Sequence, residues 1–245
     1  MLKFLGRGSG FSDNHNTAFF MKGSTLVLLD CSIMAFLKLK NGLIDQVGAE
    51  DKTSSSSTSC DDIVVLVTHT HSDHVAGIPM LIQYSYFVWK KHVTIIAPCE
   101  EVKENLAYCF DNMEGINKDA YEMITADESN LPWLRSTIPT MHVKELEGKC
   151  FGYNLEIDGT NVVYTGDTCR IEDFLDYLEN GSILYTECSS TDVIVHTPIE
   201  KILGYDELFA EKNIQVYLMH LDDESKIMTK LMVPHKAKYT FAPLY

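Results

Sequence analysis

The chain has 245 residues, enough for one α/β domain or two small ones, and 45% of them are hydrophobic, which suffices for a buried core. It carries 20 Lys and Arg against 35 Asp and Glu, a formal net charge of -15 that disfavours binding of a large nucleic acid by electrostatics. The first residues lack the long apolar core of a signal peptide, no apolar run reaches membrane-spanning length, and the seven cysteines include no C-x-x-C pair. We therefore expect a reduced, cytoplasmic protein without a membrane partner, whose cysteines are mostly buried.

The first quarter of the chain predicts short strands. Leu2–Leu5 is apolar and ends in a glycine-rich turn over residues 6–10. Ala18–Met21 and Thr25–Asp30 predict a hairpin around Lys22-Gly23-Ser24. Lys52–Cys60 is a serine-rich, low-complexity stretch that we expect to be a mobile surface loop. Because Ile63–Val67 is an unbroken apolar run, we predict a buried strand there.

The middle of the chain predicts helices between strands. Val75–Lys90 is long, apolar and unbroken after Pro79, which predicts a buried helix. Val93–Ala97 predicts a strand, and Glu100–Phe110 a helix with acidic residues in its first turn. Asp111–Leu134 has weak periodicity, and we expect it to form a lid or a partner contact.

The last part of the chain repeats the mixture of hairpin, strand and helix. Gly152–Ile157 and Asn161–Thr165 predict a hairpin across Asp158-Gly159, and Ile171–Leu178 a helix. Ile183–Thr186 and Val216–Met219 predict buried strands. Two sets of hairpins, each followed by alternating strands and helices, predict two sheets packed between helices in one domain spanning 1–245.

The strongest functional signal is a cluster of imidazoles directly after the Ile63–Val67 run. His69, His71 and His74 lie within six positions together with Asp73. His69 and His71 are two residues apart and face the same side of an extended chain. A turn at Asp73 brings Asp73 and His74 to the other side of the same point. The spacing therefore predicts a metal site built from one short segment.

Three further candidate ligands each follow a predicted strand. They are His142, Asp167 in the turn Thr165-Gly166-Asp167-Thr168, and His220. Ligands at the ends of strands converge on one edge of a sheet, where α/β proteins tend to place their sites. Each candidate alone is weak, since a single histidine is more often a surface or core residue; their joint occurrence carries the prediction.

These residues, in this order, resemble the metallo-β-lactamase superfamily, and the resemblance covers nearly the whole chain. It implies an αββα sandwich of two mixed β-sheets flanked by helices, with two divalent metal ions, zinc by preference and manganese as the alternative. The first metal would be held by His69, His71 and His142. The second would be held by Asp73, His74 and His220, with Asp167 bridging both.

Within that superfamily the chain is most similar to the phosphodiesterase branch of tRNase Z and PhnP-like enzymes. That branch carries an opening turn like Phe4-Leu5-Gly6-x-Gly8-Ser9-Gly10, with an Asn downstream like Asn16. It also carries a Glu like Glu187 and a His like His196. The resemblance implies that Glu187 orients His196, which protonates the leaving oxygen. Asp73, Glu187 and His196 are thus the expected catalytic residues.

The chain departs from tRNase Z in length and charge. Only 25 positions separate His142 from Asp167 (167 − 142), too few for the arm that holds tRNA. The small anti-Pycsar enzymes of this branch are the better match, which implies a homodimer that hydrolyses 3′,5′-cyclic nucleotides to nucleoside 5′-monophosphates in a bacterial or phage-infected cytosol, against cyclic-nucleotide immune signalling. Candidates for stacking on the base are Phe11, Tyr108, Phe110 and Trp133.

Other functions on the same metal core stay open at this point. They are a 2′,3′-cyclic phosphodiesterase, an RNA 3′-end nuclease, and a lactone or thioester hydrolase. An acyl hydrolase has no evident need for the Glu187 and His196 pair. A module that binds a nucleotide or partner without turnover is disfavoured by ligands at all seven expected positions.

Overall fold

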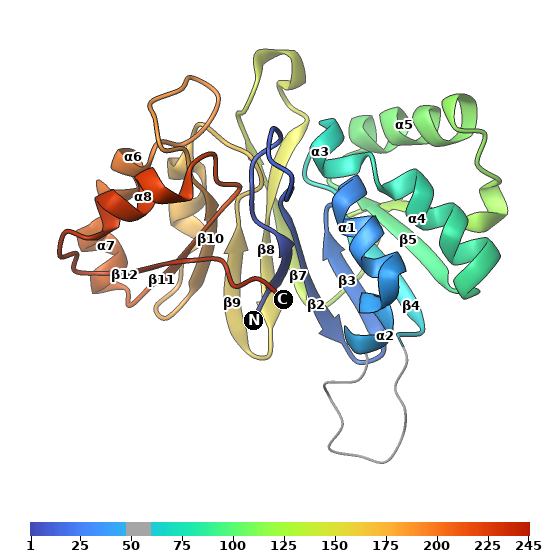
Figure 1. The fold of residues 1–245 in the computed structure, drawn as a ribbon, viewed down its shortest axis with the longest axis horizontal. Coiled ribbons are helices and arrows are strands. Elements are labelled where there is room, and N and C mark those ends of the chain that lie inside the picture. Colours follow the sequence, from blue (N-terminus) through green and yellow to red (C-terminus); the bar gives the residue numbers. More distant parts are fainter. Residues whose placement is uncertain (48–59) are drawn as a thin grey trace. The chain divides into compact units, whose positions relative to one another are not determined.

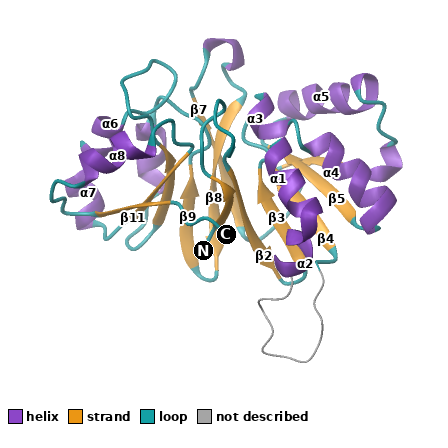
Figure 2. Ribbon diagram, viewed as in Figure 1, coloured by secondary structure: helices purple, strands orange, loops and turns teal. Residues whose placement is uncertain are grey.

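The computed structural model describes residues 1–47 and 60–245, and it divides into two compact units. The N-terminal unit comprises Leu2–Gly6, Asp13–Ser129 and Leu244–Tyr245. The C-terminal unit comprises Met1, Arg7–Ser12 and Asn130–Pro243. Apart from Cys60, the serine-rich stretch 52–60 lies outside the described residues. Figure 1 shows both units coloured along the chain, and Figure 2 marks their helices and strands.

The N-terminal unit is a six-stranded mixed sheet with the order β1-β2-β3-β4-β5-β6. Its strands are β1 (Lys3–Gly6), β2 (Thr17–Lys22), β3 (Thr25–Leu29), β4 (Asp62–Leu66), β5 (His92–Ala97) and β6 (Glu122–Thr125). The α-helices are α1 (Ile33–Lys38), α2 (Ile44–Val47), α3 (Ser72–Val75), α4 (Ile78–Tyr84) and α5 (Glu100–Tyr108). Three π-helical turns follow α1, α4 and α5 directly: η1 (Leu39–Leu43), η2 (Ser85–Trp89) and η3 (Cys109–Met113). A short 3-10 helix, η4 (Lys118–Ala120), precedes β6. β1, β2 and β3 are antiparallel, whereas β3 to β6 run parallel.

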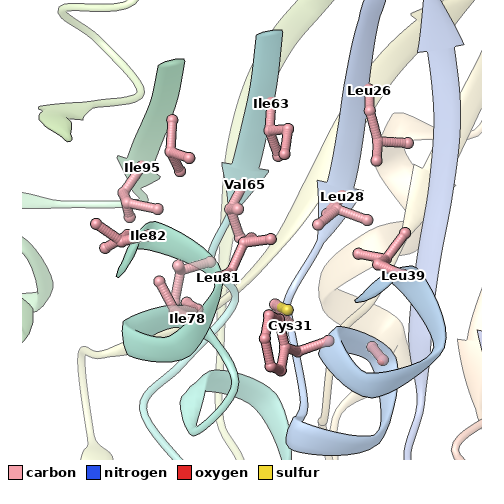
Figure 3. Close-up of a cluster of buried hydrophobic side chains, with 14 of the residues drawn as sticks. Leu26, Leu28, Cys31, Leu39, Ile63, Val65, Ile78, Leu81, Ile82 and Ile95 are labelled. Atoms are coloured by element: carbon pink, nitrogen blue, oxygen red, sulfur yellow. The ribbon is translucent and has the colours of Figure 1, made fainter. Parts of the chain in front are cut away.

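The core of this unit lies between the parallel strands and the helices that connect them. Parallel strands need crossovers, which here are helical and cover the sheet. Alternate residues of neighbouring strands point to the helices; Figure 3 shows Val65 and Ile95 next to Leu81 and Ile82 of α4, with Leu28 on the next strand of the same layer. All five side chains are fully buried, so this layer holds β3, β4 and β5, and the site residues that follow them, in fixed register.

The C-terminal unit has the sheet order β12-β11-β10-β9-β8-β7. Its strands are β7 (Leu134–Thr140), β8 (Cys150–Ile157), β9 (Thr160–Tyr164), β10 (Ile183–Glu187), β11 (Gln215–Met219) and β12 (Lys238–Phe241). The helices are α6 (Ile199–Leu203), α7 (Asp206–Glu211) and α8 (Glu224–Leu231), with the 3-10 helices η5 (Lys144–Leu146) and η6 (Ile171–Tyr177). Phe174, Ile202 and Phe209 from the helices pack with Val163 and Leu218 of the sheet in one buried cluster.

The two units share one topology, since β7, β8 and β9 are antiparallel and β9 to β12 run parallel. In each unit the candidate residues follow the carboxyl ends of strands, as parallel sheets favour. His69 comes after β4, and Asp167 and His220 come after β9 and β11. The prediction of two mixed sheets with flanking helices is confirmed.

Most predicted elements are present, and three differ. The predicted helix Val75–Lys90 is broken at Gly77, where an added Cβ would collide with the Ser32 carbonyl, and Phe87 near its end is 62% exposed rather than buried. The expected lid Asp111–Leu134 contains β6, which is tied into the sheet by parallel pairing with β5. Residues 171–177 form a 3-10 helix.

The structure also bears on the predictions about buried cysteines and membrane-spanning segments. All seven cysteines lie in the described residues as free thiols, and Cys31, Cys60, Cys150 and Cys188 are buried. Within residues 1–47 and 60–245, each helix is too short or too polar to cross a bilayer.

Candidate functional site

The N-terminal unit gathers the histidine motif around the end of β4. His71 is the N-terminal cap of α3, so Ser72–Val75 turn away from the strand direction and carry Asp73 and His74 with them. The Nε2 atom of His69 lies 3.1 Å from Nδ1 of His71, and Nε2 of His74 lies 3.2 Å from Oδ2 of Asp73. The four predicted residues are therefore brought together.

A buried aspartate that the sequence analysis missed organises this cluster. Both oxygens of Asp30 are engaged: they accept hydrogen bonds of 2.8 Å from the Thr68 amide and the Thr68 hydroxyl, and Oδ2 lies 2.8 Å from Nδ1 of His74. A carboxylate only accepts, so His74 carries its proton on Nδ1 and presents Nε2 as a ligand. The signal was present, because Asp30 follows an apolar strand just as the predicted ligands do.

The tautomer of His69 is fixed by the same network. The Thr68 hydroxyl donates its only proton to Asp30, so its oxygen accepts from Nδ1 of His69 at 3.0 Å. His69 then presents the lone pair of Nε2 toward Nδ1 of His71. Two nitrogens bound to one tetrahedral zinc would lie about 3.3 Å apart. The observed spacing therefore fits a shared cation.

The C-terminal unit gathers the remaining predicted residues. Oδ2 of Asp167 lies 3.3 Å from Nε2 of His220 and 3.8 Å from Nε2 of His142, which places one carboxylate oxygen between two imidazoles. The Nδ1 atom of His142 donates to the carbonyl of Val195 at 2.7 Å, so Nε2 is again the ligating nitrogen. All three side chains are almost fully buried.

Backbone geometry at the strand ends is unusual. Gly166 and His220 have φ values of 61° and 51°, in the left-handed region, and Asp30 has 64°. Such conformations are uncommon outside glycine and cluster at functional sites. The strand that carries His220 is tied to the opening turn, because the Leu221 amide donates to Arg7 and the Ser9 amide donates to Leu221. The glycine-rich turn thus supports His220.

Glu187 and His196 form a close pair beside these ligands. Nδ1 of His196 lies 2.6 Å from Oε2 of Glu187, and Oε1 accepts from the Thr168 amide at 2.5 Å. Glu187 is fully buried; burial raises the pKa of its carboxyl, as does the nearby Asp167, while His196 opposes that rise. The His196 side chain is 26% exposed. The pair thus joins a buried acceptor to an accessible imidazole.

The four aromatic residues considered for stacking on a nucleotide base differ in their exposure to solvent. Phe110 belongs to the core of the N-terminal unit and Trp133 is only 7% exposed, so neither offers an open aromatic face. Phe11 and Tyr108 are exposed.

Comparison with known proteins places the chain in a family. The family model described as "Anti-Pycsar protein Apyc1" matches residues 1–242. The chain belongs to the anti-Pycsar Apyc1 family. Among its relatives, the anti-Pycsar protein Apyc1 of Bacillus phage vB_BsuM-Goe3 is 26% identical over 247 residues, covering 91% of this chain and 89% of the relative.

Solved structures confirm the metallo-β-lactamase fold. The metallo-β-lactamase fold protein YhfI from Bacillus subtilis superposes with a TM-score of 0.72 at 18% identity, covering 99% of this chain and 95% of YhfI. A diphosphatase from the PhnP family superposes with a TM-score of 0.69 at 16% identity, with the same coverage of each chain. Family, fold and the His and Asp clusters together support a metal-dependent phosphodiesterase.

Proposed function

We propose that this member of the anti-Pycsar family hydrolyses 3′,5′-cyclic nucleotides to nucleoside 5′-monophosphates, and thereby counters cyclic-nucleotide antiviral signalling. The observation that carries the proposal is the Glu187–His196 pair, with 2.6 Å between Oε2 and Nδ1, beside the candidate ligands Asp167 and His220. Expelling a ribose alkoxide needs a proton donor, and this pair has the composition of one.

The proposed metal ligands are those that the family resemblance implies. His69, His71 and His142 would hold one ion, Asp73, His74 and His220 the other, and Asp167 would bridge them. The donor set supports this assignment, because Nδ1 of His69, His74 and His142 each donates to an oxygen and leaves Nε2 as the ligand. Imidazole and carboxylate suit zinc, with manganese as the alternative. When bound, two divalent ions supply positive charge to the phosphate and lower the pKa of water.

His196 would act as the acid. In its protonated form, Nε2–H donates to the 3′ oxygen of the ribose while Nδ1–H stays on Glu187. Water oxygen forms the new bond to phosphorus, the bond from phosphorus to the 3′ oxygen breaks, and the proton from His196 completes the 3′ hydroxyl. His196 recovers a proton from the water that was consumed, so atoms and charge balance. Buried Glu187 favours the charged imidazole by its negative charge.

The alternatives differ in what they require. A tRNA nuclease needs an arm between His142 and Asp167, and that segment is occupied by η5 and the hairpin of β8 and β9. Binding of long RNA is also disfavoured by the net charge of -15. A lactone or thioester hydrolase would leave the Glu187–His196 pair without a task. A 2′,3′-cyclic phosphodiesterase would use the same residues, and only substrates distinguish it.

We further propose that residues 1–245 act as one hydrolase domain in a homodimer of the bacterial or phage-infected cytosol. An apolar hollow of about 320 Å³ on the N-terminal unit supports the dimer. It is lined by Phe36, Met80, Gln83, Tyr84, Phe87 and Val88. Phe87 and Val88 are 62% and 54% exposed, and apolar patches of this kind mark interaction surfaces.

The deciding experiment incubates metal-loaded protein with 3′,5′- and 2′,3′-cyclic mononucleotides, linear RNA and a lactone, and identifies the products by chromatography. We expect 5′-monophosphate from the 3′,5′-cyclic nucleotides, and its loss in the Asp73→Ala and His196→Ala variants. Turnover of the lactone or RNA with none of any cyclic nucleotide would leave the metal site in place and refute the substrate.

A further inference from the structure

The loop that carries His196 is anchored at its start by one carboxylate. This loop, Ser189–Thr197, connects β10 to α6 and is drawn in orange in Figure 1. Oδ1 of Asp222 accepts from the Ser190 amide at 2.7 Å, and Oδ2 accepts from the Ser190 hydroxyl at 2.8 Å. Lys230 donates to the Ser190 carbonyl at 2.9 Å. Every polar backbone atom of Ser190 is therefore held from the segment after β11.

The far end of the same loop carries two functional contacts in consecutive residues. The Val195 carbonyl accepts from Nδ1 of His142, and His196 itself is bonded to Glu187. The loop closes on itself through the Ser189 amide, which donates to the Thr197 carbonyl at 2.9 Å. Because the two ends meet, the position of Ser190 constrains the position of Val195 and His196.

The tip of the loop has little other support. Val193 and Ile194 are 38% and 93% exposed, so these side chains contribute little buried surface to fix this part of the chain. Three consecutive β-branched residues, Val193 to Val195, favour a strand, yet they form none. The base of the loop is therefore held mainly by hydrogen bonds, and those that Asp222 accepts and Lys230 donates are charge-assisted.

We propose that Asp222 is a positioning residue for the acid His196. It acts through the Ser189–Thr197 loop, and it lies two residues beyond the ligand candidate His220, so one strand end supplies both a metal ligand and the anchor of the acid. This role rests on the proposed phosphodiesterase function. Both oxygens of Asp222 act as acceptors: Oδ1 also accepts from the Asp223 amide at 2.8 Å, and Oδ2 accepts from the Ser190 hydroxyl. An asparagine has only one acceptor oxygen in its side chain, so this position requires a carboxylate.

A spectroscopic test does not depend on activity. Zinc-loaded wild-type protein, Asp222→Ala, Asp222→Asn and the control Asp223→Ala are compared by NMR of the imidazole N–H protons, with His196 assigned by the His196→Ala variant. The Asp223 side chain caps α8 and makes no contact with Ser190 among the described hydrogen bonds. Asp223→Ala therefore removes one negative charge, as Asp222→Ala does, but leaves the hydrogen bonds of the loop in place. We expect the Nδ1–H resonance of His196 in wild type and Asp223→Ala, and its loss or broadening in Asp222→Ala.

A kinetic test distinguishes positioning of the acid His196 from a structural role that would slow all substrates equally. The ratio of kcat on a 3′,5′-cyclic nucleotide to kcat on a bis(nitrophenyl) phosphodiester reports the need for the acid. We expect this ratio to fall about tenfold in Asp222→Ala, to fall less in Asp222→Asn, and to stay within about twofold in Asp223→Ala. In the His196→Ala background, Asp222→Ala should lower the ratio no further, because both changes remove one function.

Three results would overturn the proposal: an unchanged His196 resonance in Asp222→Ala, no such resonance in the wild type, or equal slowing of both substrates. If wild-type protein turns over neither phosphodiester, the proposed function fails, and the NMR comparison still decides whether Asp222 positions His196.

Discussion

The carboxylate of Glu187 holds Nδ1 of His196 at 2.6 Å with one oxygen and the Thr168 amide at 2.5 Å with the other. Thr168 directly follows Asp167, the candidate bridging ligand. One buried side chain therefore ties the imidazole to the turn that carries a metal ligand. This arrangement fixes both the direction of His196 and its tautomer, because Nδ1 carries the proton shared with Glu187; Nε2 is the nitrogen that the proposed acid role would use.

Replacing Glu187 with Gln should remove this control. The amide has one acceptor oxygen, so it can serve either Thr168 or His196, and its NH2 group then faces a donor. We expect kcat on a 3′,5′-cyclic nucleotide to fall about 100-fold, with a much smaller loss on a nitrophenyl phosphodiester. Metal content is measured alongside by elemental analysis. An equal loss on both substrates at full metal content would show that Glu187 does not act through His196.

Asp30 should control metal affinity without being a ligand. Asp30→Asn keeps a side chain that tolerates the left-handed backbone at φ 64°, but it replaces one of the two acceptor oxygens that serve Thr68 and His74. We expect the affinity for zinc to fall roughly 10- to 100-fold, measured by competition with a chromophoric chelator. Asp62→Asn, at the exposed start of β4, is the matched control. Unchanged affinity in Asp30→Asn would contradict the role.

The sequence predicts those site residues whose role follows from a local pattern, and it does not predict those whose role depends on contacts with distant residues. His69, Asp167 and His220 were found because each follows an apolar run, a local pattern that also sets the strand. Asp30 has the same pattern, but its role comes from contact with Thr68 and His74, far along the chain. The Val195 carbonyl that orients His142 belongs to the backbone, and no residue type marks it.

The predicted helix over residues 75–90 shows where the sequence prediction of secondary structure differs from the structure. Its apolar pattern is continuous, so nothing nearby predicts the break at Gly77. At the break the Gly77 amide donates to the Cys31 carbonyl at 2.9 Å, and the Ser32 carbonyl lies where a Cβ at Gly77 would sit, so distant residues set both features. Similarly, Phe87 is apolar like a core residue but exposed, which is consistent with an interaction surface rather than a core.

That surface yields a prediction about assembly. Phe87→Asp places a charge in the hollow lined by Met80, Tyr84 and Val88. We expect the mass measured by light scattering after gel filtration to fall from dimer to monomer, because burying an unpaired carboxylate opposes association. Tyr108→Asp, at another exposed aromatic in the same unit, serves as the control. A wild-type monomer, or a Phe87→Asp dimer, would exclude this face as the interface.

The capping residue Asp223 should make stability depend on acid pH. The Ser225 hydroxyl and the Lys226 amide donate to its carboxylate and lower its pKa from 3.8 to about 2. A folded-state pKa below the unfolded value stabilises the fold above about pH 4, and this contribution is lost as pH falls through about 2. The stability difference between wild type and Asp223→Ala, from urea unfolding, should shrink as pH is lowered from 6 toward 3. A difference that does not vary with pH would indicate that the carboxylate is not ionised or not bonded.

Removing bound metal should lower the stability of the protein. Nε2 of His69 and Nδ1 of His71 lie 3.1 Å apart, close enough for both nitrogens to bind one cation in the folded protein. A ligand that binds only the folded state, at 1,000 times its dissociation constant, adds about 4 kcal/mol to the free energy of unfolding. We therefore expect a chelator to lower Tm by several degrees in calorimetry, and re-addition of zinc to restore it. His69→Ala removes a ligand of only one proposed ion, so its Tm should be low and should fall less with the chelator than that of wild type, whereas His92→Ala, at the exposed start of β5, should respond like wild type. If the chelator leaves the Tm of wild type and His92→Ala unchanged while elemental analysis shows that metal has been removed, the histidine cluster does not couple metal binding to folding.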